Sequence, residues 1–261
     1  MEENVNREIF NESYDADGLV LDPGNGYDRY MIDLRFRLID EYGAGKDVLD
    51  LCCGTGSYLI PKLDTVGSAV GLDFSPRLLE GFKKNLGGGI PEKLRLVEAD
   101  ARDMPLDGES VDFVFSYASL YGIPDIEKVI GEIARVLRPG GFAALEMGNS
   151  RSMSVAVANV FHKKHNWPLP CAVPFGSMRG MFDARGLDIV RRRSFQILSM
   201  YGAPPGMPFL KPVTTPRWKS VMGVKAGGKI VDEWISGSWP LRHIAFRHLF
   251  ILRKRSSAPA P

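Results

Sequence analysis

The sequence has little cysteine or histidine and no long apolar run. Its 261 residues include three cysteines and four histidines. Cys52 and Cys53 are adjacent, so the cysteines suit neither a disulfide framework nor a metal site, and we expect a reducing, cytoplasmic location. The apolar runs are far shorter than the roughly 18 residues that a membrane span needs. We therefore expect no transmembrane segment, and the polar, acidic N-terminus predicts no signal peptide.

Two nucleotide-binding patterns are also missing. The sequence contains no Gly-Lys-Ser/Thr, which excludes the phosphate loop of nucleoside triphosphatases. Gly54 and Gly56 are present, but Leu59 stands where the dinucleotide fingerprint has its third glycine. A dinucleotide site is therefore weakly supported.

The charge is nearly balanced overall but unevenly distributed. Residues 1–150 contain 15 basic and 27 acidic residues, a balance of −12, whereas residues 151–261 contain 18 and 4, a balance of +14. The basic second half indicates an anionic partner, such as a phosphate, a carboxylate, a nucleic acid or a lipid surface. The alternative is that the two halves neutralise each other within the fold.

The most informative stretch is KDVLDLCCGTGSYLIP, residues 46–61. Residues 48–51 predict a buried strand, Gly54 and Gly56 predict a tight turn, and residues 58–60 predict the first turns of a helix. Glycine has no Cβ and tolerates unusual backbone angles, so a ligand can lie against bare backbone at such a turn.

This stretch resembles motif I of the class I S-adenosylmethionine-dependent methyltransferases, an acidic residue followed by three alternating glycines. Asp50, Gly54 and Gly56 match that pattern, and Cys52 stands where the first glycine is usual. The resemblance implies that these four residues bind the cofactor S-adenosyl-L-methionine. Four more stretches follow in the family's order and spacing, so that the resemblance covers residues 46–148.

The first two stretches after motif I carry acidic residues at predicted strand ends. Asp73 ends the strand predicted at residues 66–74, and the resemblance implies that its carboxylate accepts both ribose hydroxyls, since two oxygens suit two adjacent donors. Phe74, which follows it, belongs with the cofactor residues. Asp100 ends the strand predicted at residues 94–100, and Ala101 follows it. The resemblance implies that they contact the adenine amino group and a ring nitrogen.

The remaining stretches complete the predicted cofactor site. Ser116 lies near the end of the strand predicted at residues 111–117, which is implied to enter the active site. RVLRPGG, residues 135–141, closely resembles a stock family sequence with a structural role. The helix predicted at residues 27–42 is implied to cover the cofactor, with Tyr30 as a contact. Packing at the domain edge is the alternative for this tyrosine.

The resemblance is closest to the branch that includes the ubiquinone and menaquinone methyltransferases and many small-molecule methyltransferases. It implies a doubly wound, Rossmann-like α/β fold whose seven-stranded, mostly parallel sheet has an antiparallel last strand. We expect a single domain over residues 1–261. Its predicted parts are an N-terminal segment and lid helix (1–45), a cofactor-binding half (46–148), a substrate-side half (149–254) with insertions at 149–181 and 199–240, and a disordered tail (255–261).

Methyl transfer from a sulfonium is an in-line displacement. The enzyme must hold the nucleophile, exclude water and, for a weak nucleophile, remove a proton. The cofactor supplies the electrophile, so neither a metal nor a covalent residue is obligatory. The candidate bases are His162 and His165, after the fifth predicted strand. The candidate substrate-side residues are Tyr117 and Tyr121, with packing as the alternative, and Glu146, which is also a candidate acid or base.

Two observations bear on nucleic acid as a substrate. SYAS stands after the fourth predicted strand, where amino-methylating enzymes have an Asn-Pro-Pro-Tyr type motif, which argues against DNA. Arg191, Arg192 and Arg193 suggest RNA, but alternate residues of a strand face opposite sides, so no single phosphate track is implied.

We therefore predict O-methylation of a small molecule that is anionic or partly apolar. The alternatives are C-methylation of a quinone-like ring, RNA methylation, or a non-catalytic protein that kept the fold; the oligomeric state stays open.

Overall fold

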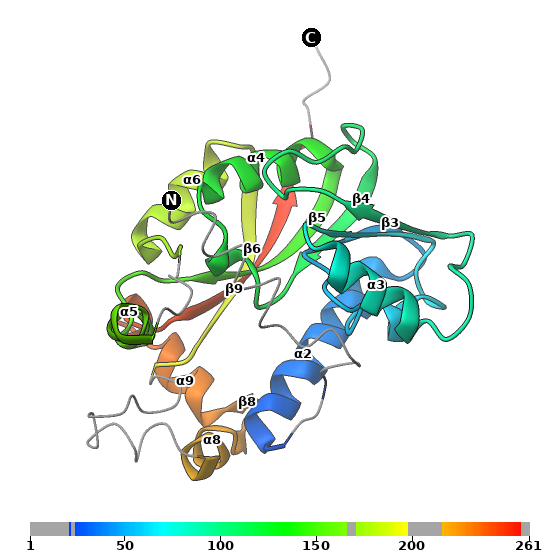
Figure 1. Ribbon diagram of the computed structural model, residues 1–261. Helices are drawn as coiled ribbons and strands as arrows, with labels where there is room; N and C mark the ends of the chain where they lie inside the picture. Colours follow the sequence, from blue (N-terminus) through cyan, green and yellow to red (C-terminus); the bar gives the residue numbers. More distant parts are fainter. Residues whose placement is uncertain (1–20, 22–23, 166–170, 198–215, 257–261) are drawn as a thin grey trace.

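A seven-stranded sheet runs through the molecule, with helices on both of its faces (Figure 1). The computed structural model describes residues 21, 24–165, 171–197 and 216–256. The elements are α2 (Gly26–Gly43), β1 (Asp47–Leu51), η1 (Ile60–Lys62), β2 (Ser68–Asp73), α3 (Pro76–Asn85), β3 (Leu94–Glu98), β4 (Val111–Ser116), η2 (Leu120–Gly122), α4 (Ile126–Val136), β5 (Leu137–Gly148), α5 (Met153–His165), α6 (Phe175–Asp183), β6 (Leu187–Phe195), α8 (Pro216–Met222), β7 (Lys225–Ala226), β8 (Lys229–Ile230), α9 (Val231–Gly237), η4 (Leu241–His243) and β9 (Arg247–Lys254).

The strand order is β3-β2-β1-β4-β5-β9-β6. The pairs from β3 to β5 are parallel, and β9 is antiparallel to both of its neighbours, β5 and β6. This confirms the predicted doubly wound fold with an antiparallel last strand. The order reverses between β1 and β4, and ligands of such sheets bind beyond the carboxyl ends of the strands at that reversal. Motif I therefore lies at the edge where a ligand is expected.

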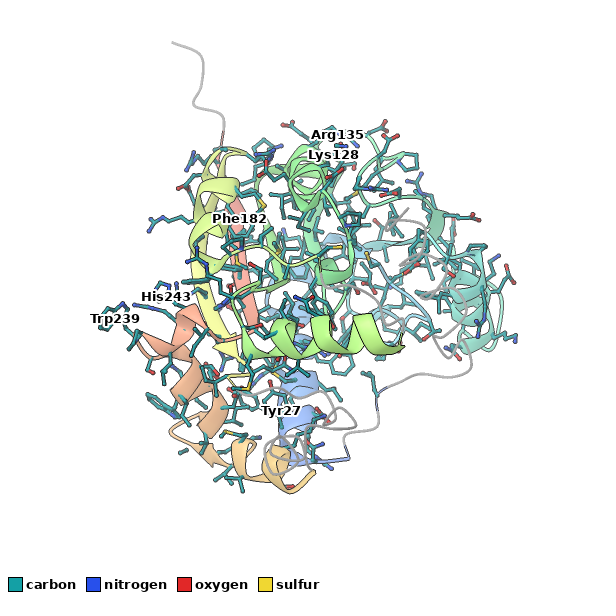
Figure 2. The ribbon with its side chains drawn as sticks, turned by 60° about the vertical axis from the view of Figure 1, so that its left-hand side comes forward. Tyr27, Lys128, Arg135, Phe182, Trp239 and His243 are labelled. Atoms are coloured by element: carbon teal, nitrogen blue, oxygen red, sulfur yellow. The ribbon has the colours of Figure 1, made fainter. Side chains whose placement is uncertain are left out.

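Each face of the sheet has its own hydrophobic core. On one face, α2 and α3 cover residues such as Phe113 and Phe115 of β4. On the other face, α4 and α6 cover residues that include Phe250 of β9, against which Phe182 packs edge-on. Figure 2 shows Phe182 on the α6 side of the sheet. Covering both faces explains why the central strands are apolar throughout rather than alternating.

Side-chain caps begin two of the helices. The Ser75 hydroxyl accepts the backbone N–H of Leu78, and Pro76 begins α3. The Asn25 side chain caps α2 in the same way by accepting from Asp28. Each cap satisfies an N–H that would otherwise lack a partner at the start of its helix.

The helix predicted directly after the glycine turn is wrong. The chain makes only the single 3-10 turn η1 there. Pro61 lies at the start of that turn and has no N–H to donate.

The second predicted insertion packs beside the start of α2. The part described contains α8, the β7–β8 hairpin and α9, which lie together at the lower edge of the molecule in Figure 1. The Asp232 carboxylate of α9 accepts the backbone N–H of Gln196 at 2.7 Å and so ties α9 to the end of β6. This places the insertion at the carboxyl edge of the sheet. Its role in shaping a substrate site stays a prediction.

Ion pairs join the acidic first half to the basic second half. They are Arg185–Glu127, Arg191–Glu41, Lys219–Asp28, Lys254–Glu109 and Arg247–Glu146. These contacts support mutual neutralisation as the explanation for part of the charge asymmetry. Arg193 is also paired, with Glu233. Arg192, the remaining one of the three arginines, lies over the ring of Phe175.

The end of the described chain is held against the sheet. The Arg255 guanidinium pairs with Asp183 and Asp188, and its backbone N–H donates to Gly186. Residues 257–261 of the predicted disordered tail lie outside the described residues. No helix in the described ranges is both long and apolar enough to cross a membrane.

Candidate functional site

The motif I loop keeps a glycine-like path although its first glycine is a cysteine. Cys52 has φ +62°, Gly54 +52° and Gly56 +83°. For a residue with a Cβ, this left-handed conformation costs about 1–2 kcal/mol. The replacement therefore adds local strain without redirecting the loop. The Cys53 N–H donates to Leu72 of β2 at 3.0 Å and seats the turn on the sheet.

The two glycines of the loop meet very different surroundings. A Cβ added to Gly56 would approach Ile60 and the Phe82 ring to 2.7 Å, so this glycine is needed for packing. A Cβ added to Gly54 would meet no atom within 4 Å. Space therefore lies open over the bare backbone at Gly54, as a bound ligand would require.

Asp73 is joined directly to this loop. One carboxylate oxygen accepts the N–H of Gly54 at 2.9 Å, and the other accepts the N–H of Ser75 at 3.0 Å. The side chain is only 4% exposed, and burial raises the pKa of its carboxyl despite these hydrogen bonds. The backbone N–H of Phe74 also donates to this carboxylate, and the remaining acceptor capacity is left for a hydroxyl donor. This geometry fits the predicted ribose contact.

Three acidic residues surround the Cys52 thiol. Burial raises the pKa of Cys52 well above its usual value, and the charges of Asp73, Asp50 and Asp100 raise it further. Burial and the neighbouring Asp73 also raise the pKa of Asp50. Such an acidic edge favours a ligand with positive charge and hydroxyl donors. S-Adenosylmethionine fits it, because it carries a sulfonium, an ammonium group and two ribose hydroxyls.

The other predicted cofactor residues lie at the same edge, with one exception. Ala101 and Ser116 are buried, and Phe74 is partly exposed. Both oxygens of Asp100 accept from the Arg102 guanidinium, at 3.0 and 2.7 Å, so an adenine amino group would share this carboxylate with Arg102.

Tyr30 is the exception. Its hydroxyl donates to Glu233 of α9 at 2.7 Å and accepts from Arg193 of β6. Burial, with the Glu233 contact, raises the pKa of Tyr30 to about 12. The structure assigns this tyrosine to holding α2 against α9 and β6, and nothing in its contacts directs it to a cofactor.

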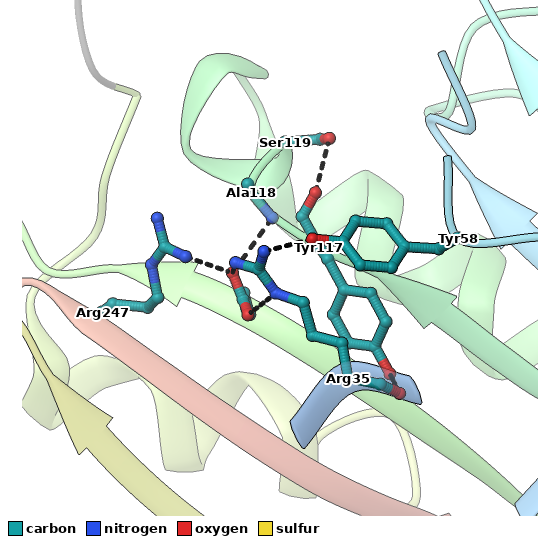
Figure 3. Close-up of polar contacts among 7 residues, drawn as sticks. Arg35, Tyr58, Tyr117, Ala118, Ser119 and Arg247 are labelled. Carbon is teal, nitrogen blue, oxygen red and sulfur yellow. Dashed lines mark hydrogen bonds and ion pairs between the residues drawn. The ribbon is translucent and has the colours of Figure 1, made fainter. Parts of the chain in front are cut away.

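Glu146 is the centre of a buried ionic cluster that sequence reasoning missed (Figure 3). It is 0% exposed, and Arg35 of α2 binds it through two parallel contacts of 2.7 and 2.8 Å. Arg247 of β9 pairs with it at 3.0 Å, and the Ala118 N–H donates to it at 3.1 Å. One carboxylate thus joins α2, the end of β4 and the start of β9.

The charges in this cluster hold each other ionised. Burial favours the neutral carboxyl of Glu146, but Arg247 and Arg35 outweigh it and hold its pKa below the usual range. Burial lowers the pKa of Arg35 and of Arg247, but the Glu146 charge outweighs it, so both pKa values are raised. A carboxyl kept ionised between two arginines is unsuited to take up a proton. The interpretation of Glu146 as an acid or base is therefore replaced by one as an anchor.

Aromatic residues connect this cluster to motif I. The Tyr58 hydroxyl, two residues after Gly56, accepts from Arg35, and the Tyr58 ring packs edge-on against Tyr117 at 5.3 Å. Tyr117 also donates its hydroxyl to the carbonyl of Arg35 at 3.4 Å. Tyr121 packs against Phe246, next to Arg247. The three predicted substrate-side residues are thus gathered around two arginines that were not predicted.

A signal for the missed arginines was present in the sequence. Arg35 lies on the apolar face of its helix, between Met31 and Ile39, and Arg247 opens an apolar strand. A charged residue at a position predicted to be buried needs a buried partner of opposite charge. Glu146 also lies in an apolar strand, so it is the acidic residue that could pair with these arginines.

The histidines give no base within the described side chains. The backbone of His162 and His165 lies in α5, but their side chains lie outside the described residues. His248 is buried, and its Nδ1 lies 3.0 Å from the Ser194 hydroxyl. His243 and Trp239, which is 73% exposed, lie at the outer surface by η4 (Figure 2). Base catalysis by His162 or His165 stays a prediction.

Comparisons with known proteins agree with this geometry. Residues 49–145 match the family model described as "Methyltransferase domain". The demethylmenaquinone methyltransferase of Lactobacillus johnsonii is 38% identical over 102 residues, which are 38% of this chain and 42% of that protein. The chain thus spans less than half the length of this relative.

Solved structures match over a greater length at low identity. An S-adenosylmethionine-dependent methyltransferase from Mesorhizobium loti has a TM-score of 0.58 at 14% identity and covers 91% of this chain and 100% of its own. The [4+2]-cyclase SpnF has a TM-score of 0.61 at 14% identity, with 97% and 94% covered. At such identity these structures support the fold alone.

The strand order, the motif I loop with Asp73, and the family match define a class I methyltransferase domain. Residues 49–145 of this chain match that domain, as the resemblance predicts for this stretch. The fold and domain imply the use of S-adenosylmethionine.

Proposed function

We propose that the chain is an S-adenosylmethionine-dependent methyltransferase acting on a small molecule, with transfer to an oxygen as the first hypothesis. The observation that carries the cofactor assignment is the open space over Gly54, with Asp73 hydrogen-bonded to the same residue. Gly54 and Gly56 would lie against the cofactor, and Asp73 and Asp100 would accept its hydroxyl and amino donors. The cofactor supplies a methyl group attached to a positively charged sulfur.

The residues of this chain would then bind and orient both reactants. The buried surface at the ends of β4 and β5 excludes water, and Tyr58 and Tyr117 present their rings beside motif I. For an acceptor that must lose a proton, His162 and His165 remain the proposed bases. Orientation and exclusion of water are the main contributions that such a transfer needs from the protein.

C-methylation of a quinone-like ring is the second candidate. It is favoured by the curated relatives similar to this chain, which are named demethylmenaquinone methyltransferases. RNA is less favoured, because Arg191 and Arg193 are already paired with Glu41 and Glu233. The likeness to a [4+2]-cyclase argues that the fold alone does not determine the reaction, so a non-methylating protein is the remaining alternative.

Calorimetry with S-adenosylhomocysteine tests the cofactor assignment. We expect Asp73→Asn to weaken binding by about tenfold or more, because a hydrogen bond to a charged group contributes about 1.5–3 kcal/mol. Asp64→Asn, at an exposed position before β2, is the matched control. Equal affinity in wild type and Asp73→Asn would contradict the assignment.

Turnover then separates the candidate functions. Release of S-adenosylhomocysteine is measured with phenols, a naphthohydroquinone and RNA as acceptors, and the methylated product is examined by NMR to distinguish an O-methyl from a C-methyl group. Binding without turnover on any acceptor would favour the non-methylating alternative. We expect His162→Ala or His165→Ala to slow turnover with cofactor affinity retained.

A further inference from the structure

The buried cluster at Glu146 carries one positive charge too many. It contains two arginines, Arg35 and Arg247, and a single carboxylate. Each arginine pairs with Glu146, but the cluster keeps a net charge of +1, and burying a net charge is costly. Asp50 and Asp73 do not neutralise this charge, because neither forms an ion pair with these arginines within the described residues. The excess charge therefore calls for an anion from outside the cluster.

The donors of the two arginines show where that anion would bind. Arg35 is fully used, with Nε and Nη2 on Glu146 and Nη1 on Tyr58. Among the residues that the structure describes, Arg247 pairs with Glu146 through Nη1, and its buried Nε has no hydrogen-bond partner there. Nε and Nη2 form the edge of the guanidinium that does not carry the Nη1 contact with Glu146. Two parallel N–H donors on one edge match the two oxygens of a carboxylate.

Arg247 stands on the substrate side of the proposed cofactor site. It is the first residue of β9 and pairs with Gly148 at the end of β5 and with Phe195 at the end of β6. These are the carboxyl ends of parallel strands, where ligands of such sheets bind. Its partner Glu146 contacts Ala118 after β4 and, through Arg35 and Tyr58, reaches the loop of motif I. The side chain is 12% exposed, so part of it is reachable.

We propose that Arg247 is the residue that binds a carboxylate of the methyl acceptor, so that the substrate is a small organic acid. This inference rests on the proposed function and adds the substrate class to it. A single carboxylate brings the charge of the cluster from +1 to zero, whereas a doubly charged phosphate would reverse its sign. Glu146 then acts as a positioning residue, because it holds Nη1 and so sets the direction of the free edge.

The test uses the protein loaded with S-adenosylhomocysteine and a matched pair of probes, benzoate and its neutral amide, benzamide. Calorimetry measures the affinity of each. We expect benzoate to bind about tenfold or more tightly than benzamide, the size of effect given by hydrogen bonds to a charged group. Inorganic phosphate, as a third probe, should compete with benzoate weakly.

Two variants locate the effect. Arg247→Met should abolish the preference for benzoate, and it should fold because Arg35 still pairs with Glu146. Arg247→Lys keeps the charge without the two-pronged edge, so we expect it to retain only part of the preference. Arg247→Lys also tests the proposal if Arg247→Met fails to fold. Arg192→Met, on the same sheet but over Phe175, is the matched control and should bind benzoate as the wild type does.

Three results would overturn the proposal: equal affinity of the wild type for benzoate and benzamide, no binding of benzoate, or unchanged binding in Arg247→Met. Tight binding of phosphate in place of benzoate would also overturn it in favour of a phosphorylated ligand. Failure of the proposed function is seen separately, because it would show as a wild-type protein that does not bind S-adenosylhomocysteine.

Discussion

Arg35 and Glu146 face each other side by side, with Nε–Oε1 at 2.7 Å and Nη2–Oε2 at 2.8 Å. This pair connects a helix that precedes motif I to a strand that follows it by about a hundred residues. Arg247 adds a second cation to the same carboxylate. This buried acidic side chain is therefore one of the contacts that hold α2 over the sheet.

Replacing Glu146 by Gln should be strongly destabilising. The change removes the only carboxylate that pairs with these two guanidiniums in the described structure, and an uncompensated buried charge costs about 3–5 kcal/mol. The free energy of unfolding is measured by urea denaturation. Glu127→Gln, whose partner Arg185 lies 3.4 Å away at the surface, should cost about 1 kcal/mol or less. Similar losses of unfolding free energy in both variants would show that the buried cluster stabilises the fold no more than a surface ion pair does.

The two glycines of the motif I loop should separate folding from binding. Gly56→Ala places a Cβ 2.7 Å from Phe82 and Ile60 and should destabilise the fold by several kcal/mol, about 1–3 from overpacking and about 1–2 from φ +83°. In Gly54→Ala the new Cβ meets no other atom, so the only cost to folding is the strained backbone conformation. The Cβ does, however, fill part of the space over the loop. The variant should remain folded and lose affinity for S-adenosylhomocysteine in calorimetry. Full affinity in Gly54→Ala would place the ligand elsewhere.

Stability should fall in mildly acidic solution because of His248. Burial, with the nearby charge of Arg192, lowers its pKa from 6.5 to about 3. Its contribution is fully present above pH 6.5 and is lost as the pH falls toward 3, because the unfolded chain takes up a proton that the folded chain refuses. The free energy of unfolding should decline by up to about 1.4 kcal/mol per pH unit.

Urea denaturation of the wild type and a His248 variant between pH 7 and 5 isolates this effect, because the difference between the two profiles removes the contribution of Asp50 and Asp73, whose pKa values are raised. His248→Gln, which can still hydrogen-bond to Ser194, should give a flatter profile over that range. A variant with the slope of the wild type would assign the dependence to another group. Below that range Glu146 adds a slope of its own, because its lowered pKa makes its contribution present above about pH 4.5 and lost as the pH falls further.

The strands and the cofactor edge were predictable because their signals are local. Apolar runs ending in Asp73 or Asp100, the glycine turn, and the Ser75-Pro76 helix start each depend on a few neighbouring residues. Long-range contacts escaped prediction. Tyr30 was assigned to the cofactor, but Arg193 and Glu233, far along the chain, hold its hydroxyl. Tyr58, Arg35 and Arg247 became visible only when the fold brought them to Glu146.

The position of β9 has a consequence for how the protein is made. β6 ends at Phe195 and β9 begins at Arg247, yet β9 lies between β6 and β5 and is the strand that joins them. While the ribosome is still translating the segment between these strands, β5 has an open edge and β6 has nothing to pair with. Nascent chains that stall in this segment would expose two unpaired edges, which are the usual starting points of aggregation.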